Sequence, residues 1–392
     1  MAPSRRQITH ADVKLGIPLP FSVYDPEGRL LLRKGVVITM AEQVSRIVER
    51  RAVMGNDDEL EPERTPAEVR AALTPRPASP QGGEAMPVFD QVGSLILNLK
   101  HSFSTALRSP DQIDLAARIR QFAGRIQLLC KADIDSALAA PHLDYVNPYI
   151  IVHQVMGAVL AEIIGRRSAM TDEERLPLVC AALTRDIGIF GIQDELDRCD
   201  GPLPEALKRV MQAHPTDGAH ILRRAGVQDK RWLAAVEQHH ERLNGAGYPG
   251  AMQADAIGQN GRILAIADTY SAMTKPRPYR NKEHLAQNAL RDIYLQKDVS
   301  LDGQLIGAMI KEIGIFPPGS IVKLKSGETG VIKHCTHKAS EAVAYTVYDQ
   351  RGMPLIEPMR RETADPDFEI VSMVPFTQCR SAAVTIKRLW LK

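Results

Sequence analysis

The chain has 392 residues, of which 44% are apolar and 24% are charged, and its formal net charge is +2 at pH 7. This length allows two or three domains with a sizeable core, and the near-neutral charge excludes a general attraction to nucleic acid or anionic membranes. The five cysteines are scattered without a CxxC pair, which is typical of reduced thiols rather than of a disulfide framework or a zinc knuckle.

The first 87 residues predict a small β unit followed by a linker. In residues 1–55, FSVYD and RLLLRKG flank the turn residues PEG in the pattern of a β-hairpin, and AEQVSRIVERRAV predicts a short helix. The N-terminus lacks the apolar run of a signal peptide, so we expect a cytoplasmic protein. Residues 56–87 are first acidic and then rich in proline, glycine and small side chains, which predicts a flexible linker.

Residues 88–315 predict an all-α domain, which we divide into a helical extension at 88–140 and a bundle at 141–315. VFDQVGSLILNLKHSFSTAL has the apolar spacing of an amphipathic helix, and Ser109 before Pro110 predicts the cap of a second helix that runs through LAARIRQFAGRIQLLC. The longest apolar stretch, YIIVHQVMGAVLAEIIG, is broken by polar residues, so we expect a buried helix and no membrane span.

Residues 316–392 predict a second small β unit. SIVKL, TGVIKHC and AVAYTVYD are short strand patterns separated by turn residues. The chain has no Cys/His finger and no long basic run, so no DNA binding is expected. The expected fold is therefore mainly α, with small β-rich units at both ends.

Histidines and aspartates recur within the apolar helix patterns of the bundle. They are His153, Asp186, His214, His239, His240 and Asp268. Taken singly, each has an ordinary explanation, since a lone histidine on an apolar helix is more often a hydrogen-bonded core residue than a ligand. Taken together, their burial needs compensation, and imidazole and carboxylate groups are both ligands that suit Fe, Mn or Zn. The pattern therefore predicts a shared metal centre.

Four motifs in this region follow one another in a recognisable order. RDIGIFGI is similar to HDIGK, HPTDGAHIL to HPxxGxxIL, HHERLNGAGYP to HHExxDGxGYP, and ADTYSAMTKPRPYR to DxxDAxTxxRPYR. Through these motifs the sequence resembles the HD-GYP phosphodiesterases, a branch of the HD-domain metal-dependent phosphohydrolases. The resemblance covers roughly residues 140–315 and implies an HD-domain helical bundle.

The resemblance implies a pair of divalent metal ions that activate water for attack on a phosphodiester, usually that of cyclic di-GMP. It implies that Asp186 bridges the two ions. It assigns His214, His239 and His240 to one metal ion and His153 and Asp268 to the other.

The resemblance also implies a substrate surface. Five loop residues would lie beside the substrate, namely Asn244, Gly245, Gly247, Tyr248 and Pro249. Arg277 and Arg280 would contact phosphate or guanine, because a guanidinium offers a bidentate fork to either group.

The sequence departs from the family pattern at three positions. Arg185 replaces the histidine of the HD pair, and arginine has no lone pair to give to a metal ion. Ile189 replaces the lysine of HDIGK, and Asn244, which can still cap a turn, replaces the aspartate of DGxGYP. Tyr149 stands where some members have a glutamate for a third metal ion, so one or two ions are expected.

Three functions remain open at this point. The first is a metal-dependent cyclic di-GMP phosphodiesterase of low activity, with Asp186, Arg185 and Tyr248 as catalytic groups and Arg185 near the substrate phosphate in place of a metal ion. The second is an inactive domain that senses cyclic di-GMP or docks onto other signalling proteins. The third is a helical scaffold without a ligand. A homodimer is compatible with each of them.

Overall fold

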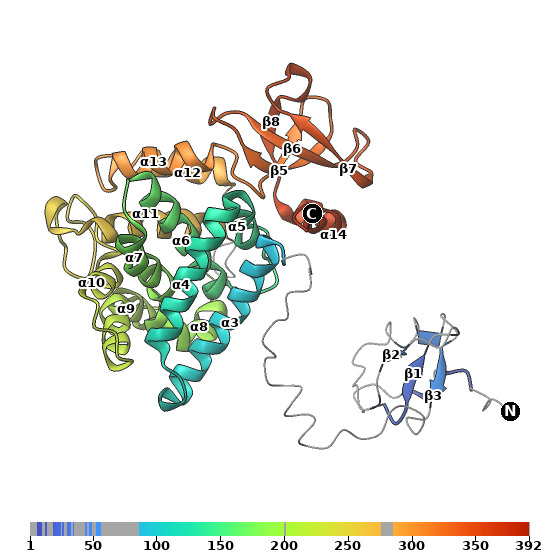
Figure 1. Cartoon of the computed structure of the whole chain (residues 1–392), viewed down its shortest axis with the longest axis horizontal. Coiled ribbons are helices and arrows are strands. Elements are labelled where there is room, and N and C mark those ends of the chain that lie inside the picture. Colours follow the sequence, from blue (N-terminus) through green and yellow to red (C-terminus); the bar gives the residue numbers. More distant parts are fainter. Residues whose placement is uncertain are drawn as a thin grey trace, which may run out of the picture. The chain divides into compact units, whose positions relative to one another are not determined.

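The structure is a computed structural model, and two compact units, residues 1–83 and 84–392, make up the chain. The described residues are 6–9, 12–13, 19–24, 26, 30–32, 34, 44, 47–48, 52–55, 86–199, 201–275 and 285–391. Most of the expected linker, together with Arg277 and Arg280, lies outside these ranges. Figure 1 colours both units along the sequence.

The N-terminal unit contains a small antiparallel sheet. Its strands are β1 (Ser22–Tyr24), β2 (Leu30–Leu32) and β3 (Val53–Gly55), in the order β2-β1-β3. β1 and β2 are the expected hairpin, with Val23 opposite Leu32. The expected helix at 41–53 lies largely outside the described residues, and its last residue was assigned wrongly. Val53 lies in β3, because it pairs with Tyr24 across the sheet.

The second unit begins with a bundle of helices that confirms the expected all-α region (Figure 1). The helices are α3 (Val88–Arg108), α4 (Leu115–Ala132), α5 (Ile134–His142), α6 (Tyr149–Arg167), α7 (Asp172–Thr184), α8 (Gln193–Asp197), α9 (Glu205–Arg224), α10 (Lys230–Gln238), α11 (Gln259–Thr274), α12 (Ala286–Tyr294) and α13 (Gly303–Ile313). The predicted cap at Ser109 is wrong in detail. Ser109 precedes only a short 3-10 turn, and α4 begins after Asp114, whose carboxylate accepts a hydrogen bond from the Ala117 backbone N–H at 2.8 Å.

Helix α6 lies at the centre of the bundle. Every residue from Ile150 to Gly165 is buried, because α4, α5, α7, α11 and α13 all pack around this helix. By length and composition alone, α6 and the segment Asp172–Asp197 could cross a membrane. Their apolar windows are 89% and 72% buried within the fold, which is typical of the core helices of a globular domain.

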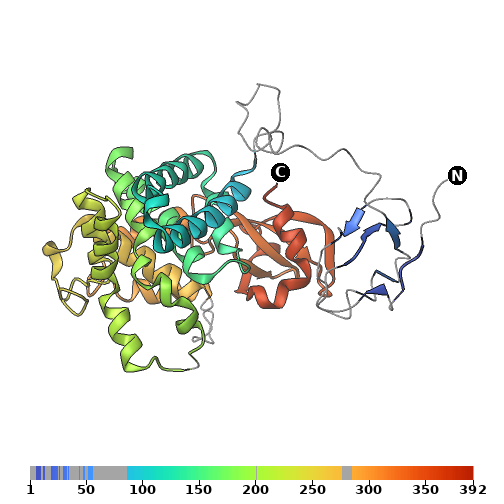
Figure 2. The same cartoon turned by 90° about the horizontal axis from the view of Figure 1, so that it is seen from below.

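The C-terminal part of this unit is a five-stranded antiparallel sheet, as the strand patterns predicted. The strands are β4 (Ile321–Leu324), β5 (Thr329–Cys335), β6 (Ala342–Tyr348), β7 (Pro354–Glu362) and β8 (Ile370–Met373), in the order β7-β6-β5-β4-β8, and helix α14 (Ala383–Arg388) follows them. Figure 2 shows the sheet and α14 beside the helical bundle. Phe89 stacks on Trp390, and Tyr145 stacks on Phe376 with ring centroids 4.2 Å apart.

Candidate metal centre

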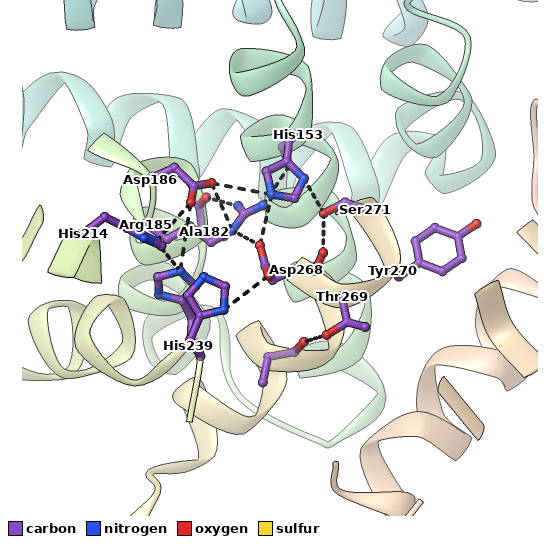
Figure 3. Close-up of polar contacts among 12 residues, drawn as sticks. His153, Ala182, Arg185, Asp186, His214, His239, Asp268, Thr269, Tyr270 and Ser271 are labelled. Carbon is purple, nitrogen blue, oxygen red and sulfur yellow. Dashed lines mark hydrogen bonds and ion pairs between the residues drawn. The ribbon is translucent and has the colours of Figure 1, made fainter. Parts of the chain in front are cut away.

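Five segments bring the predicted ligands to one point inside the bundle (Figure 3). His153 comes from α6, Asp186 follows α7, His214 comes from α9, His239 and His240 follow α10, and Asp268 comes from α11. All are buried except His240, which is partly exposed. They form two groups that could each hold a metal ion: His214 with His239 and His240, and His153 with Asp186 and Asp268. We call these the histidine half and the carboxylate half.

In the histidine half, two imidazoles face each other through their Nε2 atoms. His214 Nδ1 donates to the Met211 carbonyl and His239 Nδ1 donates to the Val236 carbonyl, each at 2.6 Å. These bonds place the ring protons on Nδ1 and leave lone pairs on the two Nε2 atoms, which lie 3.1 Å apart. Asp186 Oδ1 lies 3.4 Å from His214 Nε2. Facing lone pairs beside a carboxylate are a donor set that fits a divalent metal ion.

The electrostatics keep these imidazoles in the form that binds metal. Burial, and then the neighbouring His214, lowers the pKa of His239 to about 4. Burial and the neighbouring His239 also hold the pKa of His240 well below its usual range. Both rings are therefore neutral near pH 7, as a metal ligand must be.

In the carboxylate half, His153, Asp268 and Arg185 bond to one another, whereas Asp186 Oδ2 is buried and has no hydrogen-bond partner among the described residues. His153 Nε2 donates to Asp268 Oδ1 at 3.0 Å and lies 3.6 Å from Asp186 Oδ2. Ser271 Oγ lies 2.9 Å from the other ring nitrogen, Nδ1. His153 therefore presents an N–H to Asp268 rather than the lone pair that a metal ion needs.

Arg185 supplies the carboxylate half with a positive charge. Its side chain is fully buried, and Nε donates to Asp268 Oδ1 at 2.9 Å and lies 3.5 Å from Asp186 Oδ2. Burial by itself disfavours the charged carboxylates, but the guanidinium holds the pKa of Asp186 below its usual range. The pKa of Asp268 is also held low, by the hydrogen bond with His153 and by Arg185.

A small cavity of about 50 Å³ opens beside this centre. Among its lining residues are Tyr149, His153, Asp186, Ile189, His240 and Asp268. Ile189 thus faces the site from the position of the family's lysine. Arg185 is not among the described residues that line the cavity. Its side chain is turned into the core toward the two aspartates, and the expectation that Arg185 lies near a substrate phosphate stays a prediction.

The loop after His240 shapes the other side of the site. The ring of Tyr248 stacks on His240 with centroids 4.6 Å apart. Asn244 Oδ1 accepts from the Ala246 N–H at 3.1 Å, so Asn244 caps the turn as expected. Gly245 has a φ of 75°, and a Cβ at Gly247 would lie 2.5 Å from the backbone of the preceding segment. These two glycines let the chain fold back onto itself beside His240.

Sequence reasoning missed the residue that holds this loop. Glu241 is 2% exposed, and its carboxylate accepts hydrogen bonds from the N–H groups of Gly250 and Met252 at 2.5 and 2.8 Å. The peptide bond between Tyr248 and Pro249 is cis. A charged residue between two histidines and a glycine-rich loop was the available signal, because such a loop leaves backbone N–H groups that need acceptors.

The segments that carry these residues are similar to a known protein family. Residues 138–305 match the family model described as the HD domain. This part of the chain is similar to the HD domain family. The match covers the segments that carry all six candidate ligands, so the HD-domain bundle expected from the motifs is confirmed.

The relatives of this HD domain include two bacterial enzymes. The chain is 28% identical over 198 residues to cyclic di-GMP phosphodiesterase PA4108 from Pseudomonas aeruginosa, covering 50% of this chain and 47% of that protein. It is 27% identical over 274 residues to 3'3'-cGAMP-specific phosphodiesterase 3 from Vibrio cholerae, covering 60% and 59%. The chain thus spans about half the length of the curated relatives it matches.

Among solved structures, the chain is similar to Bd1817, an HDG"Y"P protein from Bdellovibrio bacteriovorus. The TM-score is 0.49 at 13% sequence identity, covering 78% of this chain and 98% of that one.

Proposed function

We propose that the HD domain binds a divalent metal ion, Fe, Mn or Zn, and hydrolyses a cyclic dinucleotide such as cyclic di-GMP at a low rate. The observation that carries this proposal is the 3.1 Å approach of the two Nε2 atoms of His214 and His239, whose ring protons are committed to backbone carbonyls. His240 and Asp186 supply two further ligands beside them. The names of two relatives, a cyclic di-GMP and a 3'3'-cGAMP phosphodiesterase, support the substrate class.

The chemistry is divided between the metal ion and the chain. A divalent ion bound here lowers the pKa of water and polarises a phosphodiester oxygen. Asp186 orients the centre, since its two oxygens face the two halves. Tyr248, stacked on His240, is placed to contact a base or ribose, and Gly247 lets the loop backbone lie close to the site. Arg277 and Arg280 stay predicted contacts for phosphate or guanine.

Two features of the site favour a low rate. Ile189 lines the cavity where the family pattern has a lysine, so a cation that would stabilise the phosphate in the transition state is missing. Arg185, proposed from the sequence as a catalytic group, pairs with the aspartates. Each loss of about 1.4 kcal/mol in transition-state stabilisation lowers the rate tenfold.

A second candidate is a domain that binds the dinucleotide without hydrolysing it. It is favoured by the carboxylate half, in which His153, Arg185 and Asp268 already satisfy one another. Such a domain would signal through protein partners. Both those partners and a homodimer stay predictions.

The test is an incubation of the full chain, loaded with Mn(II), Fe(II) or Zn(II), with cyclic di-GMP and 3'3'-cGAMP. The expected result is slow, metal-dependent formation of linear product, detected by chromatography, and its loss in His214→Gln. Arg185→His combined with Ile189→Lys should raise the rate. If the nucleotide stays intact after hours but binds in calorimetry, hydrolysis is rejected and the second candidate, binding without hydrolysis, is supported. Neither binding nor hydrolysis would overturn both.

A further inference from the structure

We propose that Arg185, seated on Gly157, is a built-in cation that takes the place of a metal ion in the carboxylate half. His153, Asp186 and Asp268 then hold no metal ion of their own. Metal then binds only in the histidine half. This statement about the histidine half rests on the proposed function, whereas the role of Arg185 does not.

The guanidinium of Arg185 contacts the same atoms that a metal ion would use. Its Nε donates to Asp268 Oδ1 at 2.9 Å and lies 3.5 Å from Asp186 Oδ2. His153 Nε2 approaches these same two oxygens, at 3.0 and 3.6 Å. One permanent positive charge therefore lies where the three candidate ligands of this half converge.

The rest of the guanidinium is held by backbone. Nη1 donates to the Ala182 carbonyl at 2.7 Å, and Nη2 donates to the His153 carbonyl at 3.1 Å. The bonds to Asp268 and to the two carbonyls hold the fully buried side chain. Asp186 Oδ2, which is buried without a hydrogen-bond partner among the described residues, lies 3.5 Å from Nε and interacts with the guanidinium through its charge. A second cation placed between Asp186 and Asp268 would be repelled by Arg185 and would have to displace these bonds.

Gly157 provides the space for this cation. It lies on α6 four residues after His153, and therefore on the same face of the helix. A Cβ at this position would lie 2.6 Å from Nη1, 3.0 Å from Cζ and 3.1 Å from Nη2 of Arg185. Glycine weakens a helix interior relative to alanine, so its presence in the most buried helix needs a reason. The flat guanidinium packed against the bare helix backbone is that reason.

The test is a double-mutant cycle on the full chain, read by thermal unfolding in EDTA. Gly157→Ala should lower the Tm of the helical unit by on the order of 5 °C, because Arg185 must give up bonds to make room. In an Arg185→His background, the same change should leave the Tm unchanged or raise it. Gly124→Ala is the matched control, since Gly124 is also interior to a helix, α4, and no described atom outside that helix's own backbone lies within 4 Å of its Cβ position.

Metal content separates this inference from the proposed function. After loading with Mn(II) and desalting, about one ion per chain supports both, and Arg185→His should raise the count. No bound ion, with the Gly157–Arg185 coupling intact, would support the built-in cation and overturn the metal-dependent function. Two ions in the unmodified chain would overturn the built-in cation. An equal Tm change from Gly157→Ala in both backgrounds would also overturn it. If Arg185→His does not fold, the comparison of Gly157→Ala with Gly124→Ala in the unmodified chain still tests the inference, and equal Tm changes at the two glycines would overturn it.

Discussion

The histidine half and the carboxylate half share Asp186 but compensate their buried polar groups in different ways. In the histidine half, His214 and His239 bring their Nε2 atoms to 3.1 Å from each other, and the proposed function assigns an ion from solution to this position. In the carboxylate half, Arg185 supplies a positive charge that is part of the chain. An ion from solution is lost to chelators and competes with protons, whereas an arginine does neither. The two halves should therefore differ in their response to EDTA, to pH and to mutation.

The largest expected effect is that of Arg185→Met in metal-free protein. Removing the guanidinium leaves the carboxylates of Asp186 and Asp268 buried side by side without their cation. We expect a loss of about 3–5 kcal/mol in the free energy of unfolding, measured by urea titration in EDTA. His214→Gln, measured in the same way, should cost only about 1 kcal/mol, because it removes one hydrogen bond, the one to the Met211 carbonyl. Equal losses for the two variants would contradict the distinction between the halves.

The next effect is a dependence of stability on pH that the histidine half produces. His239 has a pKa of about 4 in the fold and an ordinary value near 6.5 when unfolded, so the unfolded chain binds more protons between these values. Its contribution to stability is present above about pH 6.5 and is lost as the pH falls toward 4. The slope should be about 1.4 kcal/mol per pH unit for each such histidine.

Urea titrations of metal-free protein at pH 7, 5.5 and 4.5 would measure this slope. His240, His142 and His153, whose pKa values are also lowered by burial, add to it. His239→Gln should remove one histidine's share. Asp186 and Asp268 stay ionised throughout this range, because their pKa values are held low, and they add no slope. A slope unchanged by His239→Gln would contradict the assignment.

The smallest expected effect concerns the loop that supports the histidine half. Glu241→Gln keeps one acceptor oxygen but loses the other, so one of the N–H groups of Gly250 and Met252 is left without its partner. We expect a loss of about 1–2 kcal/mol in the free energy of unfolding. Glu237→Gln is the control, because Glu237 forms a partly exposed ion pair with Arg223 and should change stability by less than about 0.5 kcal/mol. Similar losses for both variants would show that Glu241 has no special role.

The sequence predicted those features that repeat a period or a motif. The buried α6, the bundle around it and the C-terminal strands follow from apolar spacing, and the six candidate ligands follow from motifs that keep their order. The direction of the Arg185 side chain was not predictable, because it depends on the space that α6 leaves beside Gly157. Gly157 gave no signal either, since a glycine in a helix pattern looks like a weak helix former until its neighbour is known. Strand β3 was missed because three residues carry too little pattern to outweigh the adjoining helix signal.

The position of Asp186 makes the two halves thermodynamically dependent on each other. Its Oδ1 faces His214 in the histidine half, and its Oδ2 faces the fixed charge of Arg185 in the carboxylate half. The same carboxylate therefore interacts with both halves. By linkage, any change in Arg185 that alters the affinity of the histidine half for metal is matched by an equal effect of that metal on the stability that Arg185 confers. Under the proposed function, the metal affinity of the histidine half would thus be set partly by a residue that never touches the ion.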